Sequence, residues 1–194
     1  MRYSFFFFAF WVLLFASCTE PESNSEKIDI TEKTDFMLKL YKNIDGQLHY
    51  WETWNNDNKS AIIHWGIVGQ KGQDKKIKSG LFSDLKKSVQ KEIDEKIKEG
   101  FTEFDEGKII FLDIEYIIDG FGTDSNLDKR HRLEERLNET LGWTGLGHVD
   151  GGSTGSGTME VGCVVVDFEI AKKVIEEDLK DTEFGDYSRF IKLE

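Results

Sequence analysis

The stretch that decides the fold is Ser-Ala-Ile-Ile-His-Trp-Gly-Ile-Val at residues 60–68, followed by Gly-Gln-Lys-Gly-Gln at residues 69–73. The first segment is rich in β-branched and aromatic residues, which is typical of a β-strand. The glycines of the second segment indicate a loop, which leads into a short basic strand at residues 75–78. The stretch therefore predicts two strands joined by a glycine-containing loop.

Two further strands are expected on the amino-terminal side. Phe36, Leu38 and Leu40 recur at every second position and so share one face of a strand. An Asp-Gly pair within residues 43–47 is a hairpin signal, and a second strand follows at residues 49–54 before a polar turn at 55–58. Together with the stretch above, these segments predict an antiparallel meander.

One amphipathic helix is expected after the meander. Leu85, Val89, Ile93 and Ile97 recur every four residues, Ser83 can cap the start, and Gly100 is placed to end the helix. A helix laid across an antiparallel sheet makes an α+β module.

The motifs of residues 34–104 resemble a WGR domain, a family named for a Trp-Gly-Arg tripeptide that precedes a Gly-x-x-Gly-Gln turn. The resemblance rests on residues 50–52, on His64 to Gln73 and on the Lys/Glu-rich helix. Trp65 takes the position of the family's Trp, whereas Ile67 replaces its Arg. Eukaryotic members occur in ADP-ribose polymerases that sense DNA breaks, where the Trp stacks on a nucleotide sugar and the Arg relays contacts between domains. The resemblance thus implies a nucleic-acid interface but does not carry over the Arg relay.

The chemistry of a nucleic-acid interface would need cations beside a stacking platform. The candidates are Trp65, Lys71, Lys75, Lys76 and Lys78. Against them, residues 34–104 contain no Arg, the residue best suited to bidentate phosphate recognition. Lysines on a terminal strand also protect a sheet edge from aggregation. We therefore expect Trp51, Trp54 and Trp65 to be core or protein-interface aromatics, with nucleic-acid binding as an alternative.

Residues 105–194 predict a second α+β module. Its expected elements are a strand at 108–118, a helix with Leu133, Leu137 and Leu141 that ends at Gly142, a strand at 159–166, a helix capped by Asp167 and a strand at 189–193. With a glycine-rich hairpin between the helix at 133–141 and the strand at 159–166, the order is β-α-β-β-α-β. This order resembles the ferredoxin-like arrangement, in which helices cover one face of an antiparallel sheet.

The glycine-rich run at residues 145–157 is the best candidate for chemistry in the second module. We interpret it as a flexible hairpin, because neither a P-loop lysine nor a helix directly follows the glycines. The alternative is a ligand loop of a small hydrolase or ligand-binding protein, with His148, Asp150, Gly151 and Gly152 as its candidate residues. Two such side chains are too few for a typical zinc site, and we expect no metal and no cofactor.

The amino terminus predicts that the protein is exported from the cytosol. Residues 1–18 have a charged start, an apolar run from Phe5 to Ala16 and a small-residue end, as a secretory signal does. The apolar run is shorter than the roughly 20 residues that span a membrane. Its end, Phe-Ala-Ser-Cys, resembles the lipobox of bacterial lipoproteins, which implies lipidation of Cys18 and anchoring to the outer or cytoplasmic membrane of a bacterial envelope. Residues 19–33 are polar and predict a flexible tether.

The two modules differ in charge. The whole chain has a net charge of −12, while residues 34–104 carry 12 Lys against 11 acids, for a net of +1. Residues 105–194 carry 10 Lys and Arg against 21 acids, for a net of −11, which should repel nucleic acid and anionic lipid. We therefore interpret the chain as a membrane-anchored, non-catalytic lipoprotein that binds a protein partner, an immunity factor against a basic toxin being a special case. The nucleic-acid binder and the small hydrolase are the alternatives.

Overall fold

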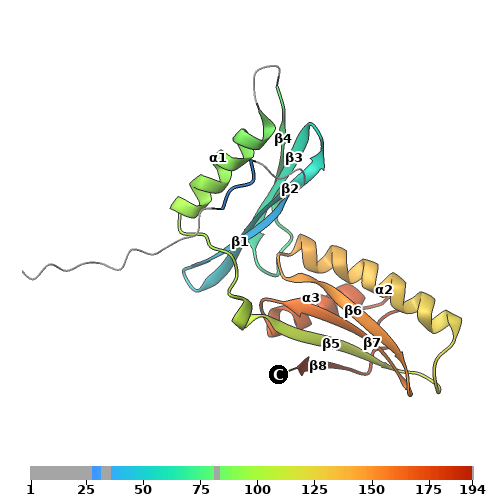
Figure 1. Cartoon of the computed structure of the whole chain (residues 1–194). Coiled ribbons are helices and arrows are strands. Elements are labelled where there is room, and N and C mark those ends of the chain that lie inside the picture. Colours follow the sequence, from blue (N-terminus) through green and yellow to red (C-terminus); the bar gives the residue numbers. More distant parts are fainter. Residues whose placement is uncertain (1–27, 32–35, 81–83, 194) are drawn as a thin grey trace, which may run out of the picture.

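The first half of the chain forms an antiparallel meander covered on one face by a helix. The computed structural model describes residues 28–31, 36–80 and 84–193 (Figure 1). The sheet order is β1-β2-β3-β4, and the elements are β1 (Met37–Ile44), β2 (Gln47–Asp57), β3 (Ser60–Ile67), β4 (Gln73–Lys78) and α1 (Leu85–Lys98). We call residues 36–104 the first module. The predicted meander and its helix are confirmed.

Helix α1 is amphipathic, and its apolar stripe faces the sheet. Leu85, Val89 and Ile93 are buried in a core that includes Leu40 and Trp51. Asp84 caps the helix by accepting a hydrogen bond from the Lys86 backbone N–H at 3.0 Å. The cap therefore differs from the predicted Ser83, which lies outside the described residues.

Gly100 ends the same helix, as predicted. It has a φ of +90°, a left-handed conformation that glycine adopts without steric cost. The Gly100 N–H donates to the Ile97 carbonyl at 2.9 Å, and the Phe101 N–H donates to the Lys96 carbonyl at 3.0 Å. These two bonds form a Schellman motif, which satisfies carbonyls that the helix end leaves without a partner. Phe101 then folds back into the core.

Part of the predicted tether belongs to the folded unit. Ile30 is 1% exposed in the core of the first module. The Gln90 side chain accepts a hydrogen bond from the Ile30 N–H at 2.9 Å and donates one to the Ile28 carbonyl at 2.8 Å. Residues 28–31 therefore lie against α1, which corrects the expectation of a flexible tether for these four residues; residues 19–27, 32 and 33 lie outside the described part of the chain.

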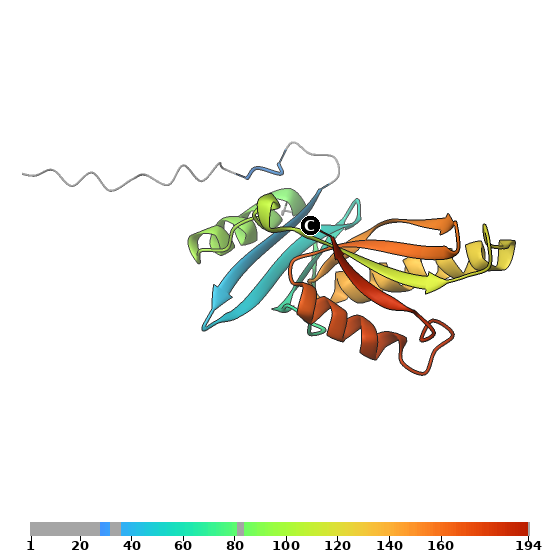
Figure 2. The ribbon, with the colours of Figure 1, turned by 90° about the horizontal axis from the view of Figure 1, so that it is seen from below.

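The second half forms another four-stranded antiparallel sheet, in the order β6-β7-β5-β8. Its elements are β5 (Ile110–Ile117), α2 (Asp124–Trp143), β6 (Gly147–Gly155), β7 (Thr158–Val165), α3 (Phe168–Leu179) and β8 (Arg189–Leu193), after a short 3₁₀ turn at Glu106–Lys108. We call residues 105–193 the second module. Both helices pack on one face of this sheet, and no described helix covers the other face (Figure 2). The predicted element order is confirmed, including the Asp167 cap, which accepts a bond from the Ile170 N–H at 2.9 Å.

Two predictions about the second module are wrong. Helix α2 continues through Gly142 to Trp143, because the backbone does not turn left-handed at Gly142 and does so only at Gly145, where φ is +67°. The run at 145–157 is not a flexible hairpin loop. Its residues 147–155 are strand β6, which pairs with β7 throughout and has one bulge between Val149 and Gly151. The hairpin turn itself is confined to Ser156 and Gly157.

The two modules share a hydrophobic core. Tyr41, Tyr50 and Val68 of the first module cluster with buried residues of the second, among them Leu141 and Leu146. The chain is thus built as two sheets that meet through one face of the first sheet and the end of α2 (Figure 1). Of the helices that the structure describes, none has the length and apolarity needed to cross a membrane.

Cys163 lies inside the second core, as predicted for a buried hydrophobe. It is 1% exposed, and burial, with a smaller contribution from the Asp113 charge, raises the pKa of its thiol to about 12. The raised pKa lowers the fraction of reactive thiolate at pH 8 by roughly 1,000-fold relative to a free thiol. We therefore expect iodoacetamide to alkylate Cys163 at least that much more slowly in the native protein than in the chain unfolded in urea, as measured by mass mapping of its peptide. Equal rates in the two states would contradict this assignment.

Candidate functional site

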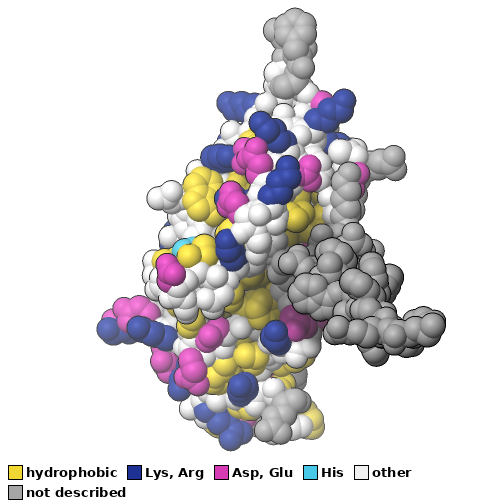
Figure 3. Space-filling view, turned by 90° about the vertical axis from the view of Figure 1, so that its left-hand side faces the viewer, with side chains coloured by type: hydrophobic (Ala, Val, Ile, Leu, Met, Phe, Trp, Pro, Cys, Tyr) yellow, Lys and Arg dark blue, Asp and Glu magenta, His cyan; other side chains and the backbone are white. Residues whose placement is uncertain are grey.

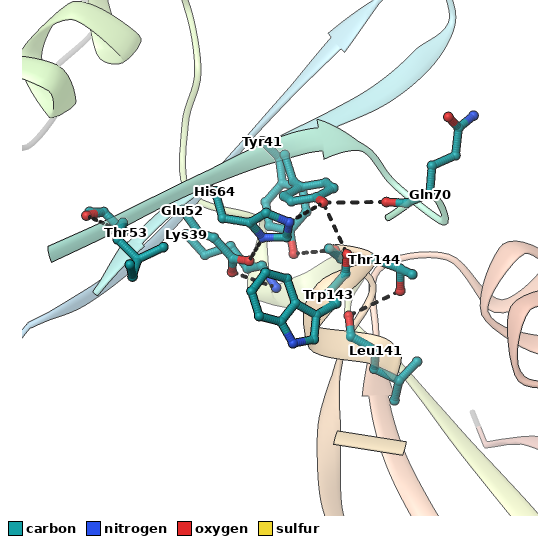
Figure 4. Close-up of polar contacts among 12 residues, drawn as sticks. Lys39, Tyr41, Glu52, Thr53, His64, Gln70, Leu141, Trp143 and Thr144 are labelled. Carbon is teal, nitrogen blue, oxygen red and sulfur yellow. Dashed lines mark hydrogen bonds and ion pairs between the residues drawn. The ribbon is translucent and has the colours of Figure 1, made fainter. Parts of the chain in front are cut away.

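The carboxyl end of α2 is where the first module attaches. A helix end leaves backbone carbonyls without partners. Those of Leu141 and Gly142 accept from the backbone of Leu146 and Gly145, and the first module supplies partners to the carbonyls that follow. The Tyr50 hydroxyl lies 3.3 Å from the Trp143 carbonyl, the Gly69 N–H donates to the Thr144 carbonyl at 2.8 Å, and the Tyr41 hydroxyl donates to the Gly145 carbonyl at 3.0 Å. Figure 4 shows Tyr41 and His64 beside Trp143 and Thr144 at this end of α2. Residues 143–145 are thereby held against the β1-β2-β3 face.

A buried polar chain supports this attachment from the first module. Lys39 Nζ lies 3.1 Å from Glu52 Oε2, and Glu52 Oε1 accepts a hydrogen bond from His64 Nδ1 at 2.7 Å. His64 Nε2 then lies 3.0 Å from the Tyr50 hydroxyl. Glu52 and His64 are 3% and 1% exposed, so this network is shielded from water. A buried network of this kind fixes one arrangement only when its members are mutually satisfied.

The two tyrosines of the junction are held in their neutral form. Burial raises the pKa of Tyr41 and of Tyr50 above the ordinary value, and the negative charge of Glu52 raises both further. A hydroxyl that keeps its proton remains a donor: that of Tyr41 donates to the Gly145 carbonyl, and that of Tyr50 has its single proton for one of two close acceptors, His64 Nε2 at 3.0 Å or the Trp143 carbonyl at 3.3 Å. The junction is therefore a set of neutral donors and one carboxylate whose charge is paired.

A cleft opens beside the junction, between the two modules. Its volume is about 1,410 Å³, and it runs from the β1-β2 edge of the first sheet across the end of α2 to β6 and β7. Figure 3 shows hydrophobic side chains gathered in the hollow between the first module, at the top, and the second module, below. The cleft is larger than the roughly 300–1,000 Å³ of typical small-molecule pockets.

Three aromatic rings form the wall of the cleft nearest the junction. The ring centroid of Trp143 lies 4.8 Å from that of His64 and 6.2 Å from that of Trp54, and both pairs meet edge to face. Trp143 is 40% exposed, and Met37, the cross-strand partner of Trp54, is 73% exposed and also lines the cleft. Large apolar side chains exposed together in a hollow are typical of an interaction site.

The structure does not bring the nucleic-acid candidates together on one surface. Trp65 packs on the α1 side of the first sheet, as does Lys75, which pairs with Glu92 at 2.8 Å. Lys76 and Lys78 lie on the opposite face of the sheet, where Lys76 is 3.8 Å from Asp57.

Lys71 lies in the β3–β4 loop and lines a small hollow of about 340 Å³ at the end of α2. Trp51 is a core residue, and Trp54 lines the cleft.

The candidates of the glycine-rich run lie along an edge strand. His148, Asp150, Gly151 and Gly152 are exposed, and Asp150 sits at the bulge of β6. Of these residues, His148 is the one that reaches the cleft. Among the residues that the structure describes, no three His, Cys, Asp or Glu side chains gather in a way that could hold a metal ion. Cys18 lies outside the described residues, as does the rest of the predicted signal.

Apart from His148 and Trp54, the residues that line the junction and cleft were not among the sequence candidates. The sequence of the first sheet nevertheless contains a pattern that indicates a second covered face. Leu38 and Leu40 face α1. The opposite face of the sheet, which would be polar if it faced solvent, instead carries aromatic side chains. These are Tyr41, Tyr50, Trp54 and His64. Aromatic residues on both faces indicate a second covering layer. The sequence does not identify that layer as the end of α2, because the contact joins residues about 100 positions apart.

Comparisons of this chain with protein-family models, with curated proteins and with solved structures find no match. The proposals below therefore rest on the residues and their geometry.

Proposed function

We propose that this protein is a lipid-anchored, non-catalytic binding protein of a bacterial envelope that holds a protein partner in the cleft between its two modules. The observation that carries the proposal is the cleft itself, which is wide, open and lined by aromatic and apolar side chains, of which Met37 and Trp143 are exposed. The titratable groups deepest in its wall, Glu52 and His64, bond each other, which suits a structural role better than proton transfer to a substrate.

The proposed identity of the modules follows the same reasoning. The four-stranded meander with α1 on one face supports a WGR-like first module, and the order β6-β7-β5-β8 with both helices on one face supports a ferredoxin-like second module. The dispersal of Lys75, Lys76 and Lys78 over two faces favours a protein partner over nucleic acid for the first module. Lipidation at Cys18 and attachment to the outer or cytoplasmic membrane complete the proposal, with an immunity factor as its special case.

Site-specific photo-crosslinking in the native host tests the proposal. A photoreactive phenylalanine replaces Met37 on the lip of the cleft, and the matched control carries it at Phe121, which is 85% exposed in the loop after β5. We expect a discrete protein adduct in the membrane fraction from position 37 and none of that mass from position 121. The same adduct from both positions, or no adduct from position 37, would overturn the cleft as the binding surface.

A further inference from the structure

The charges around the cleft are strongly unbalanced. Among the described lining residues there are one Lys and four Glu, and the single Lys, Lys39, already pairs with Glu52. The other three acids are Glu103, Glu106 and Glu139. All three are exposed, and none forms an ion pair with any residue that the structure describes. Among the described residues, the lining of the cleft thus carries an excess of negative charge, and the cations nearest its Glu139 side, Lys71 and Arg136, line the adjacent small hollow.

The aromatic wall adds a second preference for cations. The face of an indole ring is electron-rich and attracts Lys and Arg side chains. Trp54 and Trp143 meet edge to face, and Trp143 remains 40% exposed. Glu139 lies on α2 four residues before Trp143, so it is on the same side of the helix as the exposed indole. A cation placed over Trp143 would therefore have a carboxylate nearby.

From this arrangement we propose that the occupant of the cleft is a basic segment of a protein partner, in which Lys or Arg side chains alternate with apolar ones. The inference rests on the proposed function and specifies the chemistry of its partner. The apolar side chains contact the hydrophobic lining, while the cations meet Trp143 and the three free glutamates. The volume of about 1,410 Å³ favours several residues of a chain over a small organic cation.

The test uses fluorescein-labelled peptides of eight residues on the mature, full-length protein. An alternating Leu-Lys peptide is the probe, and alternating Leu-Ser and Leu-Glu peptides are the comparisons. Binding is measured by fluorescence anisotropy across a salt series. We expect the Leu-Lys peptide to bind at least tenfold more tightly than the Leu-Ser peptide, with an affinity that falls as salt rises.

A matched pair of triple variants distinguishes peptide binding in the cleft from attraction by the overall negative charge of the protein. The cleft variant is Glu103→Gln, Glu106→Gln and Glu139→Gln. The control is Asp128→Asn, Glu135→Gln and Glu177→Gln, which removes three other exposed acids that make no ion pair with described residues and changes the net charge equally. We expect the cleft variant to weaken Leu-Lys binding at least tenfold and the control to change it less than twofold. Equal losses in the two variants, or equal binding of the Leu-Ser peptide, would overturn the proposal.

The cleft variant, combined with the photoreactive residue at position 37, distinguishes the two proposals. If the adduct forms and the three substitutions abolish it, both are supported. An adduct that persists unchanged in the cleft variant would leave the binding function standing and refute the basic partner. No adduct in the parent protein would remove the proposed function itself.

Discussion

Replacing His64 with Leu is expected to lower the free energy of unfolding by about 3 kcal/mol. The substitution keeps an apolar side chain of similar size beside Trp143 but removes the donor that lies 2.7 Å from Glu52 Oε1. Glu52 is 3% exposed, so its carboxylate would be left without one of its two partners where water cannot replace it. Removing one hydrogen-bond partner of a buried carboxylate costs about 1.5–3 kcal/mol, and the simultaneous loss of the Tyr50 contact at the other ring nitrogen puts this substitution at the upper end.

The double variant Glu52→Leu with His64→Leu tests whether this loss comes from the carboxylate that has lost its imidazole partner. Because two apolar side chains leave no orphaned charge, we expect the double variant to recover at least half of the stability lost in His64→Leu. Lys39, whose side chain is 20% exposed, can then turn its ammonium group to solvent. Urea unfolding followed by tryptophan fluorescence measures all three proteins. Additive losses in the double variant would contradict the buried pair.

Replacing Gly145 with Ala should destabilise the protein by a similar amount, about 3 kcal/mol, for a different reason. Gly145 has a φ of +67°, a conformation that strains residues with a Cβ. A Cβ at this position would lie 2.2 Å from Cδ1 of the Tyr50 ring, which is 1% exposed and bonded at the junction. Backbone strain and overpacking each cost about 1–3 kcal/mol, and they act together here.

Gly142→Ala is the matched control, three residues earlier in the chain. Gly142 lies within α2, and a Cβ added there meets nothing within 4 Å. Alanine is the better helix former, so this substitution should raise the free energy of unfolding by about 0.5–1 kcal/mol. Opposite signs for the two variants in the same urea experiment are the expected result. A loss of stability at position 142 comparable to that at 145 would contradict the assigned helix boundary.

The elements of this fold could be predicted from local patterns, and the errors have local causes. The four-residue period of Leu85, Val89 and Ile93 identified α1, and an alternating pattern identified the strands of the first sheet. The run at 145–157 was misinterpreted because glycine is rare inside strands. Pairing with β7 overrides that preference, since β7 supplies a continuous ladder of backbone partners to β6. Helix α2 likewise passes Gly142 because glycine only weakens a helix interior.

The candidate site could not be predicted in the same way. Its parts come from β1, β2, β3 and the end of α2, and no short-range spacing relates Tyr50 to Trp143 or Tyr41 to Gly145. Trp65, Lys75 and Lys76 are candidates because a stacking ring and two cations lie close together in the sequence. Strand alternation then placed Lys75 and Lys76 on opposite faces of one sheet, so proximity in sequence did not become proximity on one surface.

The residues of the shared core are synthesised at different times, because they lie far apart in the sequence. Tyr41 and Tyr50 emerge from the ribosome before residues 141–146, which cover them. At about 10 residues per second, the roughly 40 residues between the end of the first module and Gly145 take on the order of four seconds to synthesise. During that interval the aromatic face of the first sheet has no cover.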